Sequence, residues 1–370
     1  MSGQTHDYEH LFLNGTPMMD VRAPIEFAKG AFPSSENCPI LDNEQRAEIG
    51  TRYRQEGKEQ AIDLGHRLAT PEIRAARVKT WATFVAAHPD CVLYCHRGGM
   101  RSELTQHWLQ EAGVEVVRVE GGYRALRGYL MQQLESCAEA VPLWVISGRT
   151  GIGKTELLHQ FPNHIDLEGL AGHRGSSFGR RVVEQPSQAS FEHAVALVML
   201  KHQRQESIPL MIEDESKLIG RRAVPVPLFD AMKTAPIVVL EASLESRVTR
   251  IARDYGHVAT LEYQAAYGEE EGRRRFADTL QQSLKNIRKR LGLEAYQALA
   301  ALLTEAIDAL HEHRDDAGLR EVIRRLLSDY YDPMYDFQLQ RKADRVVFRG
   351  TKTEILSWWA TRGQTGSTDS

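Results

Sequence analysis

The sequence contains no stretch of about 18 or more apolar residues, so no segment of it is expected to span a membrane. Its beginning lacks the basic and apolar regions of a signal peptide, and no internal repeat is visible. The chain has only 4 cysteines, too few for a disulfide scaffold, which predicts reduced thiols and a cytoplasmic location. An excess of basic charge is also missing. With a net charge of −4, contact with nucleic acid would need cations gathered on one face.

Length and patterning predict two α/β domains. A chain of 370 residues is about twice the usual domain size, and a hydrophobic content of 42% supports packed cores. On both sides of residues 136–143, short apolar runs alternate with helical patterns, which favours α/β layers with largely parallel sheets. We expect a first domain at 8–136, a second at 140–260 and a helical extension of the second at 261–360, in a monomeric protein. The helical patterns of the first domain cover residues 45–68, 71–87, 101–112 and 123–134.

A cysteine lies where an apolar strand pattern gives way to an amphipathic helix. It begins the run Cys95-His96-Arg97-Gly98-Gly99-Met100-Arg101-Ser102. The N–H groups at a helix N-terminus favour an anion, and Gly98 and Gly99 let the backbone curl around it. A thiol at the centre of such a loop is expected to have a lowered pKa and to act as a nucleophile. Arg97 and Arg101 would add positive charge and grip an oxyanion, with His96 beside them in the loop.

The alternative for a free cysteine is a buried structural role. We favour that role for Cys38, Cys91 and Cys137, and the functional role for Cys95. A redox pair of Cys91 and Cys95 is disfavoured, because four residues along a strand separate the two thiols by roughly 13 Å.

A second strand-to-helix turn carries a phosphate-binding pattern. Residues 148–155 match G-x-x-x-x-G-K-T directly after the apolar run 143–146. The backbone N–H groups of such a loop would cradle a diphosphate, Lys154 would neutralise its terminal oxygens, and the Thr155 hydroxyl would bind Mg²⁺. The glycines of the pattern are Gly148, Gly151 and Gly153.

An acidic turn supplies a candidate partner for the metal ion. Glu213 and Asp214 end another apolar run, and either carboxylate would bind Mg²⁺ directly or through water. The alternative is a solvated acidic turn without a ligand. Neither an adenine-reading pattern nor an arginine finger is evident, so both a nucleotide and a prenyl diphosphate stay open as ligands of the loop.

The most basic stretch, residues 273–290, has a local net charge of +6. On a helix, its four apolar residues would share one face and leave the cations outside. Such a surface suits the backbone of a nucleic acid, although a solvated helix face is an equally good interpretation. The candidate cations are Arg273, Arg274, Arg275, Lys285, Arg288, Lys289 and Arg290.

The N-terminal part of the chain, residues 10 to 135, resembles rhodanese-like domains. The resemblance rests on Asp-Val-Arg at 20–22, Gly-Ala-Phe-Pro at 30–33 and Glu-Gly-Gly-Tyr at 120–123. The five residues between Cys95 and Arg101 depart from the commonest rhodanese loop and match the spacing of cysteine phosphatases. Those enzymes usually place His before the Cys, whereas Tyr94 stands there in this chain.

The order of the motifs resembles the bacterial tRNA 2-selenouridine synthase family, from about residue 8 to residue 355. Residues 173–179 and 212–216 add to the resemblance. It implies a rhodanese-like parallel-sheet domain followed by a P-loop α/β domain with a helical C-terminal extension. That family replaces sulfur by selenium at position 2 of a wobble 2-thiouridine in tRNA, with selenophosphate as donor. It also S-geranylates the same base from geranyl diphosphate.

On this interpretation Cys95 carries selenium as a selanylcysteine held by the loop and Arg101. Residues 148–155 hold the diphosphate with Mg²⁺, and the basic stretch binds tRNA. Three alternatives stay open: a rhodanese-type sulfurtransferase coupled to an ATP-using P-loop domain, a cysteine phosphatase, and a non-enzymatic tRNA-binding protein.

Overall fold

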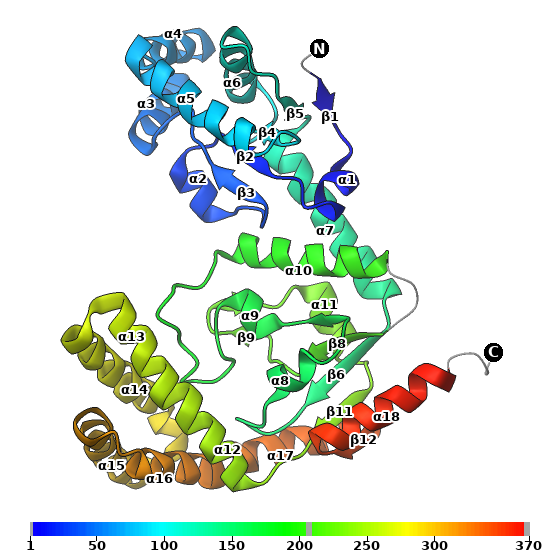
Figure 1. The fold of residues 1–370 in the computed structure, drawn as a ribbon, viewed down its shortest axis with the longest axis vertical. Helices are drawn as coiled ribbons and strands as arrows, with labels where there is room; N and C mark the ends of the chain where they lie inside the picture. The colour runs from blue at the N-terminus through cyan, green and yellow to red at the C-terminus, as the bar shows by residue number, and fades with distance from the viewer. Residues whose placement is uncertain (1–2, 205–208, 366–370) are drawn as a thin grey trace. The chain divides into compact units, whose positions relative to one another are not determined.

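The computed structural model describes residues 3–204 and 209–365, and the chain divides into two compact units. Unit 1 comprises Met1–Cys137 and Ser187–Arg204; unit 2 comprises Ala138–Pro186 and Gln205–Ser370. Each unit holds a five-stranded sheet of parallel strands with helices, so the predicted α/β class is confirmed (Figure 1). Among the described residues, no helix combines the length and the apolarity needed to cross a membrane.

The sheet of unit 1 brings several strand ends to one edge. Its order is β1-β5-β4-β2-β3, and all neighbouring strands are parallel. Because parallel strands end at the same edge, Arg22, Cys95 and Glu120 follow their strands on one side of the sheet. The strands are β1 (Gln4–Thr5), β2 (Met18–Asp20), β3 (Ser35–Asn37), β4 (Val92–Tyr94) and β5 (Val117–Val119).

The helices of unit 1 follow the predicted patterns with one break. The pattern at 71–87 is matched by α5, where the Thr70 side chain caps the first turn and Pro71 opens it. The single helix predicted at 45–68 is instead two, α3 and α4, because Gly57 between them has a φ of +93°. The helices are α1 (Tyr8–Leu13), α2 (Pro24–Lys29), α3 (Asn43–Glu56), α4 (Lys58–Leu68), α5 (Pro71–Ala87), α6 (Met100–Glu111), α7 (Gly122–Ala140) and α10 (Gln188–Gln203).

Helix α10 belongs to unit 1, although it lies within residues 140–260 that were expected to form the second domain. The N–H group of Ala31 donates to the Ser190 hydroxyl at 3.0 Å, and Nδ1 of the buried His193 lies 2.9 Å from the Ala31 carbonyl oxygen. Arg127 of α7 forms an ion pair with Glu192 at 2.6 Å. These contacts join segments far apart in sequence, so local patterns do not reveal them.

The sheet of unit 2 has the order β12-β11-β6-β8-β7, again with parallel neighbours. Since β6 and β8 are adjacent, the loop after Ser147 and the Glu213 side chain lie at the same edge. The strands are β6 (Leu143–Ser147), β7 (His164–Ile165), β8 (Leu210–Glu213), β11 (Ile237–Leu240) and β12 (Val346–Gly350), with a separate antiparallel pair β9 (Leu218–Ile219) and β10 (Arg222–Ala223).

The C-terminal part of unit 2 is mostly helical, as expected, but also returns one strand to the sheet. β12 lies inside the predicted helical extension (261–360) and pairs with β11, about a hundred residues earlier. The helices of unit 2 are α8 (Lys154–Leu158), α9 (Leu167–Ala171), α11 (Val226–Met232), α12 (Leu244–Ile251), α13 (Ala259–Tyr267), α14 (Glu269–Leu291), α15 (Leu293–His313), α16 (Ala317–Leu326), α17 (Asp332–Gln340) and α18 (Lys352–Thr365). Two π-helical segments, Ala252–Val258 and Leu327–Tyr331, and a 3₁₀ turn, Ala343–Arg345, join some of them.

Candidate functional site

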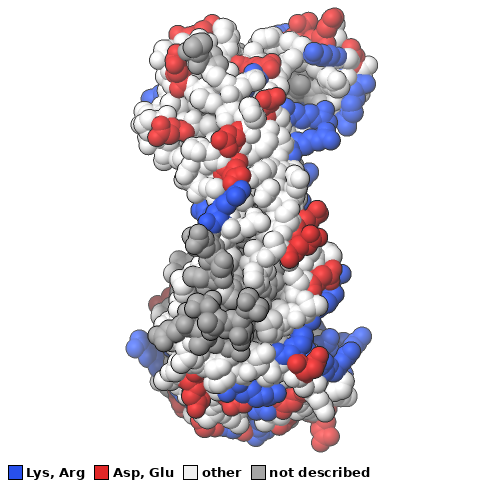
Figure 2. Space-filling view, turned by 90° about the vertical axis from the view of Figure 1, so that its right-hand side faces the viewer, with Lys and Arg blue, Asp and Glu red and all other residues white. Residues whose placement is uncertain are grey.

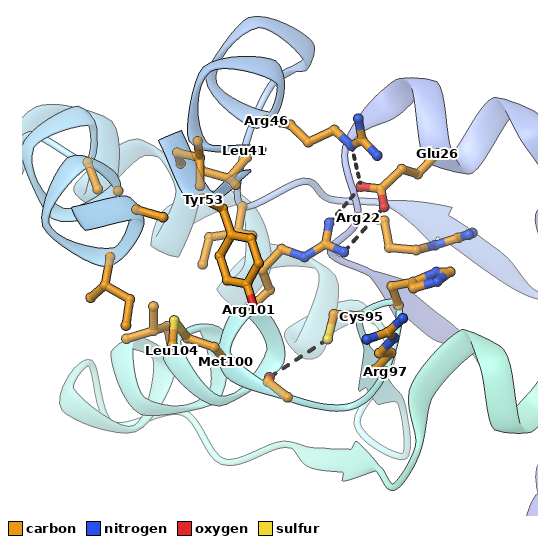
Figure 3. A pocket seen from close by; sticks show the side chains of 18 of the residues that line it. Arg22, Glu26, Leu41, Arg46, Tyr53, Cys95, Arg97, Met100, Arg101 and Leu104 are labelled. Carbon is orange, nitrogen blue, oxygen red and sulfur yellow. Dashed lines mark hydrogen bonds and ion pairs between the residues drawn. The ribbon is translucent and has the colours of Figure 1, made fainter. Parts of the chain in front are cut away.

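Cys95 is the first residue after β4 and lies five residues before α6 begins. Its side chain is 3% exposed, with Sγ 3.2 Å from the Ser102 hydroxyl oxygen and 3.7 Å from the Gly99 carbonyl oxygen. The same residue lines a pocket of about 970 Å³ (Figure 3). The other thiols are also free and buried, and burial raises the pKa of Cys38 to about 12 and that of Cys91 to about 11. Those thiols suit a structural role, whereas Cys95 borders a cavity.

The segment from the end of β4 into the first turn of α6 (the cysteine loop, residues 95–102) leaves backbone donors unused. Within the part of the chain that the structure describes, the N–H groups of residues 96–101 make no hydrogen bond. They precede and open a 12-residue helix, whose dipole adds partial positive charge at this end. Successive N–H groups of this kind form a nest that binds anions.

The turn after β5 packs against the cysteine loop and shapes it. The N–H group of Tyr123 donates to the Cys95 carbonyl at 2.9 Å, and that of Arg124 donates to the His96 carbonyl at 3.1 Å. Gly122 has a φ of +57°, and a Cβ atom at this position would lie 2.3 Å from the Cys95 carbonyl oxygen. Only glycine fits there, so this turn holds the backbone on both sides of the thiol.

Arg101 has a carboxylate partner in the structure. Its Nη1 and Nη2 atoms lie 2.6 Å and 3.2 Å from the two carboxylate oxygens of Glu26 in α2 (Figure 3). Arg46 of α3 lies 3.4 Å from the same carboxylate. Burial raises the pKa of Glu26, but the hydrogen bonds and charge of Arg101 outweigh this effect and hold that pKa below its ordinary value. An oxyanion in the loop would therefore compete with Glu26 for Arg101, while the exposed Arg97 stays accessible.

A buried ion pair underlies the same turn. Asp20 is 0% exposed, and its carboxylate accepts from Nη2 of Arg22 at 2.6 Å and from Nε at 2.9 and 3.0 Å. The Arg22 Nη2 atom also donates to the Gly30 carbonyl at 2.7 Å. The guanidinium carbon lies 3.9 Å from the ring centroid of Tyr123, the residue that donates to Cys95. The Asp-Val-Arg motif thus stabilises the turn that holds the cysteine loop.

The phosphate-binding pattern (the phosphate loop, residues 148–155) joins β6 to α8. Gly153 has a φ of +94°, which favours glycine, and a Cβ atom there would lie 3.0 Å from the guanidinium of Arg250. Apart from the N–H group of Ile152, the backbone donors of this loop make no hydrogen bond to described residues. The loop therefore offers N–H groups to a phosphate chain.

Lys154 lies among carboxyl groups. Its Nζ atom is 3.9 Å from the Glu215 carboxylate. Burial lowers the pKa of Lys154, but the charges of Glu215, Glu168 and Glu213 outweigh burial and raise that pKa. Burial raises the pKa of Glu213 to about 7, although a hydrogen bond from Thr155 opposes the rise. Burial and the neighbouring carboxylates also raise the pKa of Glu168.

The predicted metal ligands separate into two groups. The Thr155 hydroxyl donates to Glu213 at 2.6 Å, whereas Asp214 accepts from Nζ of Lys342 at 2.7 Å and from the Ser147 hydroxyl at 2.5 Å. Thr155 and Glu213 fit Mg²⁺, because a hydroxyl and a carboxylate supply hard oxygen ligands. Among the described residues no group of three or more His, Cys, Asp or Glu side chains is arranged for a metal ion. Phosphate oxygens would have to complete the coordination.

The polar loop 173–179 lies against this acidic cluster. A Cβ atom at Gly175, whose φ is +50°, would lie 2.1 Å from Glu168 Oε1 and 2.9 Å from Glu215 Oε2. Arg174 pairs with Glu262 at 3.3 Å. Since Glu215 is also 3.9 Å from Lys154, this motif lies near the phosphate loop.

The basic stretch forms most of α14, and its predicted apolar face is buried. Arg273, Arg274 and Arg275 pair with glutamates of the first turn at 2.6 to 2.7 Å. The three glutamates of this turn lower the charge from +6 for residues 273–290 to +3 for the helix. Figure 2 views the protein from the side opposite α14 and shows Lys and Arg interspersed with Asp and Glu there. The cations of the stretch without an ion-pair partner among the described residues are Lys285, Arg288, Lys289 and Arg290.

Comparison with known proteins identifies the family. The family model described as the tRNA 2-selenouridine synthase AAA domain matches residues 141–366. A tRNA 2-selenouridine synthase from Marinobacter nauticus is 46% identical over 98% of both chains, and one from Hahella chejuensis is 47% identical over 98% of this chain and 96% of its own. The chain belongs to the tRNA 2-selenouridine synthase family. A solved N-terminal domain of a putative ATP/GTP binding protein from Clostridium difficile is 29% identical and covers 35% of this chain and 99% of its own, with a TM-score of 0.32, too low to carry an argument.

In this member of the tRNA 2-selenouridine synthase family, two arginines that support the phosphate loop belong to no sequence motif. Arg247 and Arg250 of α12 donate to the carbonyls of Thr150 and Gly151 at 3.3 and 3.2 Å. Arg250 also pairs with Glu156 at 3.2 Å. These arginines are about a hundred residues from the phosphate loop in sequence, so only the fold shows that they support it.

Proposed function

We propose that the protein replaces sulfur by selenium at position 2 of wobble 2-thiouridine in tRNA, with selenophosphate as the selenium donor. The name shared by relatives that align over 95% or more of this chain supports the reaction. The structural observation that supports it best is the Cys95 thiol at the border of a large pocket, beside six consecutive N–H groups with no partner among the described residues.

In this proposal Cys95 carries selenium as a selanylcysteine. Its thiolate attacks the selenium of selenophosphate, and the phosphorus leaves as phosphite with the electron pair of the Se–P bond. The N–H groups of residues 96–101 would hold the oxygens of selenophosphate or the negative charge on selenium. Arg97 would add a fixed positive charge, and Arg101 would do so if the anion displaced Glu26 from it. The pocket walls would keep water from the reactive selenium.

The exchange would proceed through an S-geranyl-2-thiouridine made from geranyl diphosphate. A thiocarbonyl sulfur is a poor leaving group, whereas the alkylated sulfur leaves as geranylthiolate when the terminal selenium of the selanylcysteine adds at C2. A thiol reductant supplied with the substrates then cleaves the S–Se bond, which releases 2-selenouridine and restores the Cys95 thiol. We assign the diphosphate of the geranyl donor to the phosphate loop and to Lys154. Thr155 and Glu213 would hold Mg²⁺, which would offset the negative charge of the phosphates.

Mass spectrometry of tRNA nucleosides tests the proposal, with geranyl diphosphate and selenophosphate added separately and together. We expect the geranylated nucleoside with the first reagent alone and selenouridine with both. Cys95→Ala should block selenation of geranylated tRNA, while the matched control Cys91→Ala, a buried thiol four residues earlier, should not. Lys154→Ala should block geranylation.

Two results would contradict these assignments. Selenation at a normal rate by Cys95→Ala would remove the thiol from the reaction, and normal geranylation by Lys154→Ala would remove the phosphate loop from it. ATP-dependent transfer of sulfur to tRNA, without incorporation of selenium, would favour a sulfurtransferase instead.

A further inference from the structure

The pocket beside Cys95 is much larger than a selenium donor requires. Its volume of about 970 Å³ lies at the upper end of the range of about 300–1,000 Å³ that buries a drug-sized organic ligand. Selenophosphate has only a handful of heavy atoms and would occupy a small part of that space. The remaining space needs an occupant that reaches Cys95 at one end.

The two ends of the pocket differ in chemistry. Figure 3 shows Cys95, Arg97 and Glu26 toward one side, and Leu104 and Tyr53 toward the other. The apolar wall comes largely from three helices. Its residues are Ile49 and Tyr53 of α3, Ala61 and Ile62 of α4, and Leu104 of α6, with Ala69 just after α4. Two polar side chains, His66 and Arg77, interrupt this wall.

Helix α3 contributes no buried residue to the protein core. Its 14 residues nevertheless include Ile49 and Tyr53 on the pocket wall, and Tyr53 is 57% exposed. Apolar side chains gain free energy when they leave water, and a helix without such burial receives little stabilisation from packing. An apolar ligand in the pocket would provide the missing burial for α3.

The rim of the pocket carries cations. Lys29, Lys58 and Arg97 line it and are exposed, and none of them forms an ion pair with a described residue. Free cations around an apolar cavity suit a ligand whose apolar part enters the cavity while phosphate groups stay outside. A free hydrocarbon would contact the apolar wall but would have no group to bind the cations of the rim.

We propose that the apolar end of this pocket holds the geranyl chain attached to the sulfur of the tRNA base. The base itself would reach the cysteine loop, and the phosphates of the tRNA backbone would contact the cations at the rim. This assignment rests on the proposed function and adds a binding site that the reaction alone does not locate. The pocket would then recognise the prenyl group, so that only geranylated 2-thiouridine binds with its base next to Cys95.

Binding of two modified RNAs to the full-length protein tests the inference. The probes are anticodon stem-loops that carry S-geranyl- or S-methyl-2-thiouridine, and the readouts are their Kd values and their single-turnover selenation. We expect the wild type to bind the geranyl RNA about 30-fold more tightly than the methyl RNA, a fraction of what full burial of the extra carbons would give. Ile62→Trp, which fills the pocket from α4, should reduce this ratio to about threefold or less.

The matched control is Gln60→Trp, which adds the same bulk two residues away at an exposed position outside the pocket lining. It should keep the wild-type ratio. Unchanged binding of the methyl RNA by Ile62→Trp shows that this variant folds, and Leu41→Trp provides a second filling variant from another segment of the wall.

The outcomes separate the inference from the function on which it rests. If the wild type selenates the geranyl RNA and both filling variants still prefer it about 30-fold, the geranyl site is elsewhere and only the inference fails. If the wild type does not selenate geranyl RNA at all, the proposed function fails. If Ile62→Trp loses affinity for geranyl diphosphate itself and keeps its preference for geranyl RNA, the pocket is the donor site and the inference is overturned.

Discussion

Replacing Asp20 by Asn tests the ion pair that supports the cysteine loop. Asp20 is fully buried and the Arg22 side chain is 3% exposed, so the change leaves a guanidinium charge inside the protein without its counter-ion. Removing one partner of a buried pair costs about 3–5 kcal/mol. The amide oxygen of Asn can still accept one hydrogen bond, so we expect about 3 kcal/mol. The ratio of folded to unfolded unit 1 should fall by roughly two orders of magnitude.

Hydrogen–deuterium exchange of β2 and β4 in urea measures this loss locally, because a chain of two units need not unfold in one step. Iodoacetamide should also alkylate Cys95 faster, since Arg22 lies over the ring of Tyr123, which donates to the Cys95 carbonyl. Asp63→Asn, at an exposed carboxylate of α4, is the control. Adding Arg22→Met removes the unpaired charge and should recover part of the loss. A cost below about 1 kcal/mol for Asp20→Asn, or no recovery in the double variant, would refute the reasoning.

Three further predictions concern stability, tRNA and metal dependence. Burial lowers the pKa of His193 from 6.5 to about 4, so the unfolded chain takes up a proton at this residue before the folded chain does. The free energy of unfolding of unit 1 should therefore fall by up to about 3 kcal/mol between pH 6.5 and pH 4. His193→Gln should remove this pH dependence, which the midpoints of urea unfolding measure. The double variant Arg288→Glu, Lys289→Glu should weaken tRNA binding and reduce the slope of log K against log salt by up to about 0.9 per lost phosphate contact. Arg274→Gln should change binding little, because ion pairs already neutralise Arg274. Equal effects of the two changes would contradict the assignment. EDTA should abolish geranylation by geranyl diphosphate yet leave selenation of already geranylated RNA unchanged, and loss of both activities would disprove the division.

Much of the fold could be predicted because the relevant signals are local. The Thr-Pro start of α5 and the apolar spacing of α14 each lie within one element, and both elements have the expected limits or buried face. The strand-to-helix positions of both loops follow from an apolar run, a glycine-rich turn and an amphipathic segment. These patterns need no knowledge of which strands are neighbours.

The partners of charged residues could not be predicted, because they depend on the fold. Arg101 is 75 residues from Glu26, and no local pattern couples them. For Arg274 the opposite applies: its partner Glu271 is one helical turn away, but it lies just before residues 273–290, the basic stretch of the sequence. The strand β12 likewise depends on pairing with β11, so its sequence alone, followed by helical residues, did not reveal it.

Both loops offer an anion backbone N–H groups that are unpaired within the described part of the chain, but the charges around them differ. The two steps of the proposed reaction should therefore differ in whether they require Mg²⁺. Around the cysteine loop, Glu26 is already neutralised by Arg101, and exposed cations such as Arg97 and Lys58 remain, so an anion of the size of selenophosphate meets net positive charge. Around the phosphate loop the half-buried Lys154 faces several carboxyl groups, and a diphosphate that approaches them is repelled unless a divalent cation intervenes. The requirement for Mg²⁺ should therefore belong to transfer of the geranyl group and not to transfer of selenium. The carboxyl groups that create it are those of Glu168, Glu213 and Glu215.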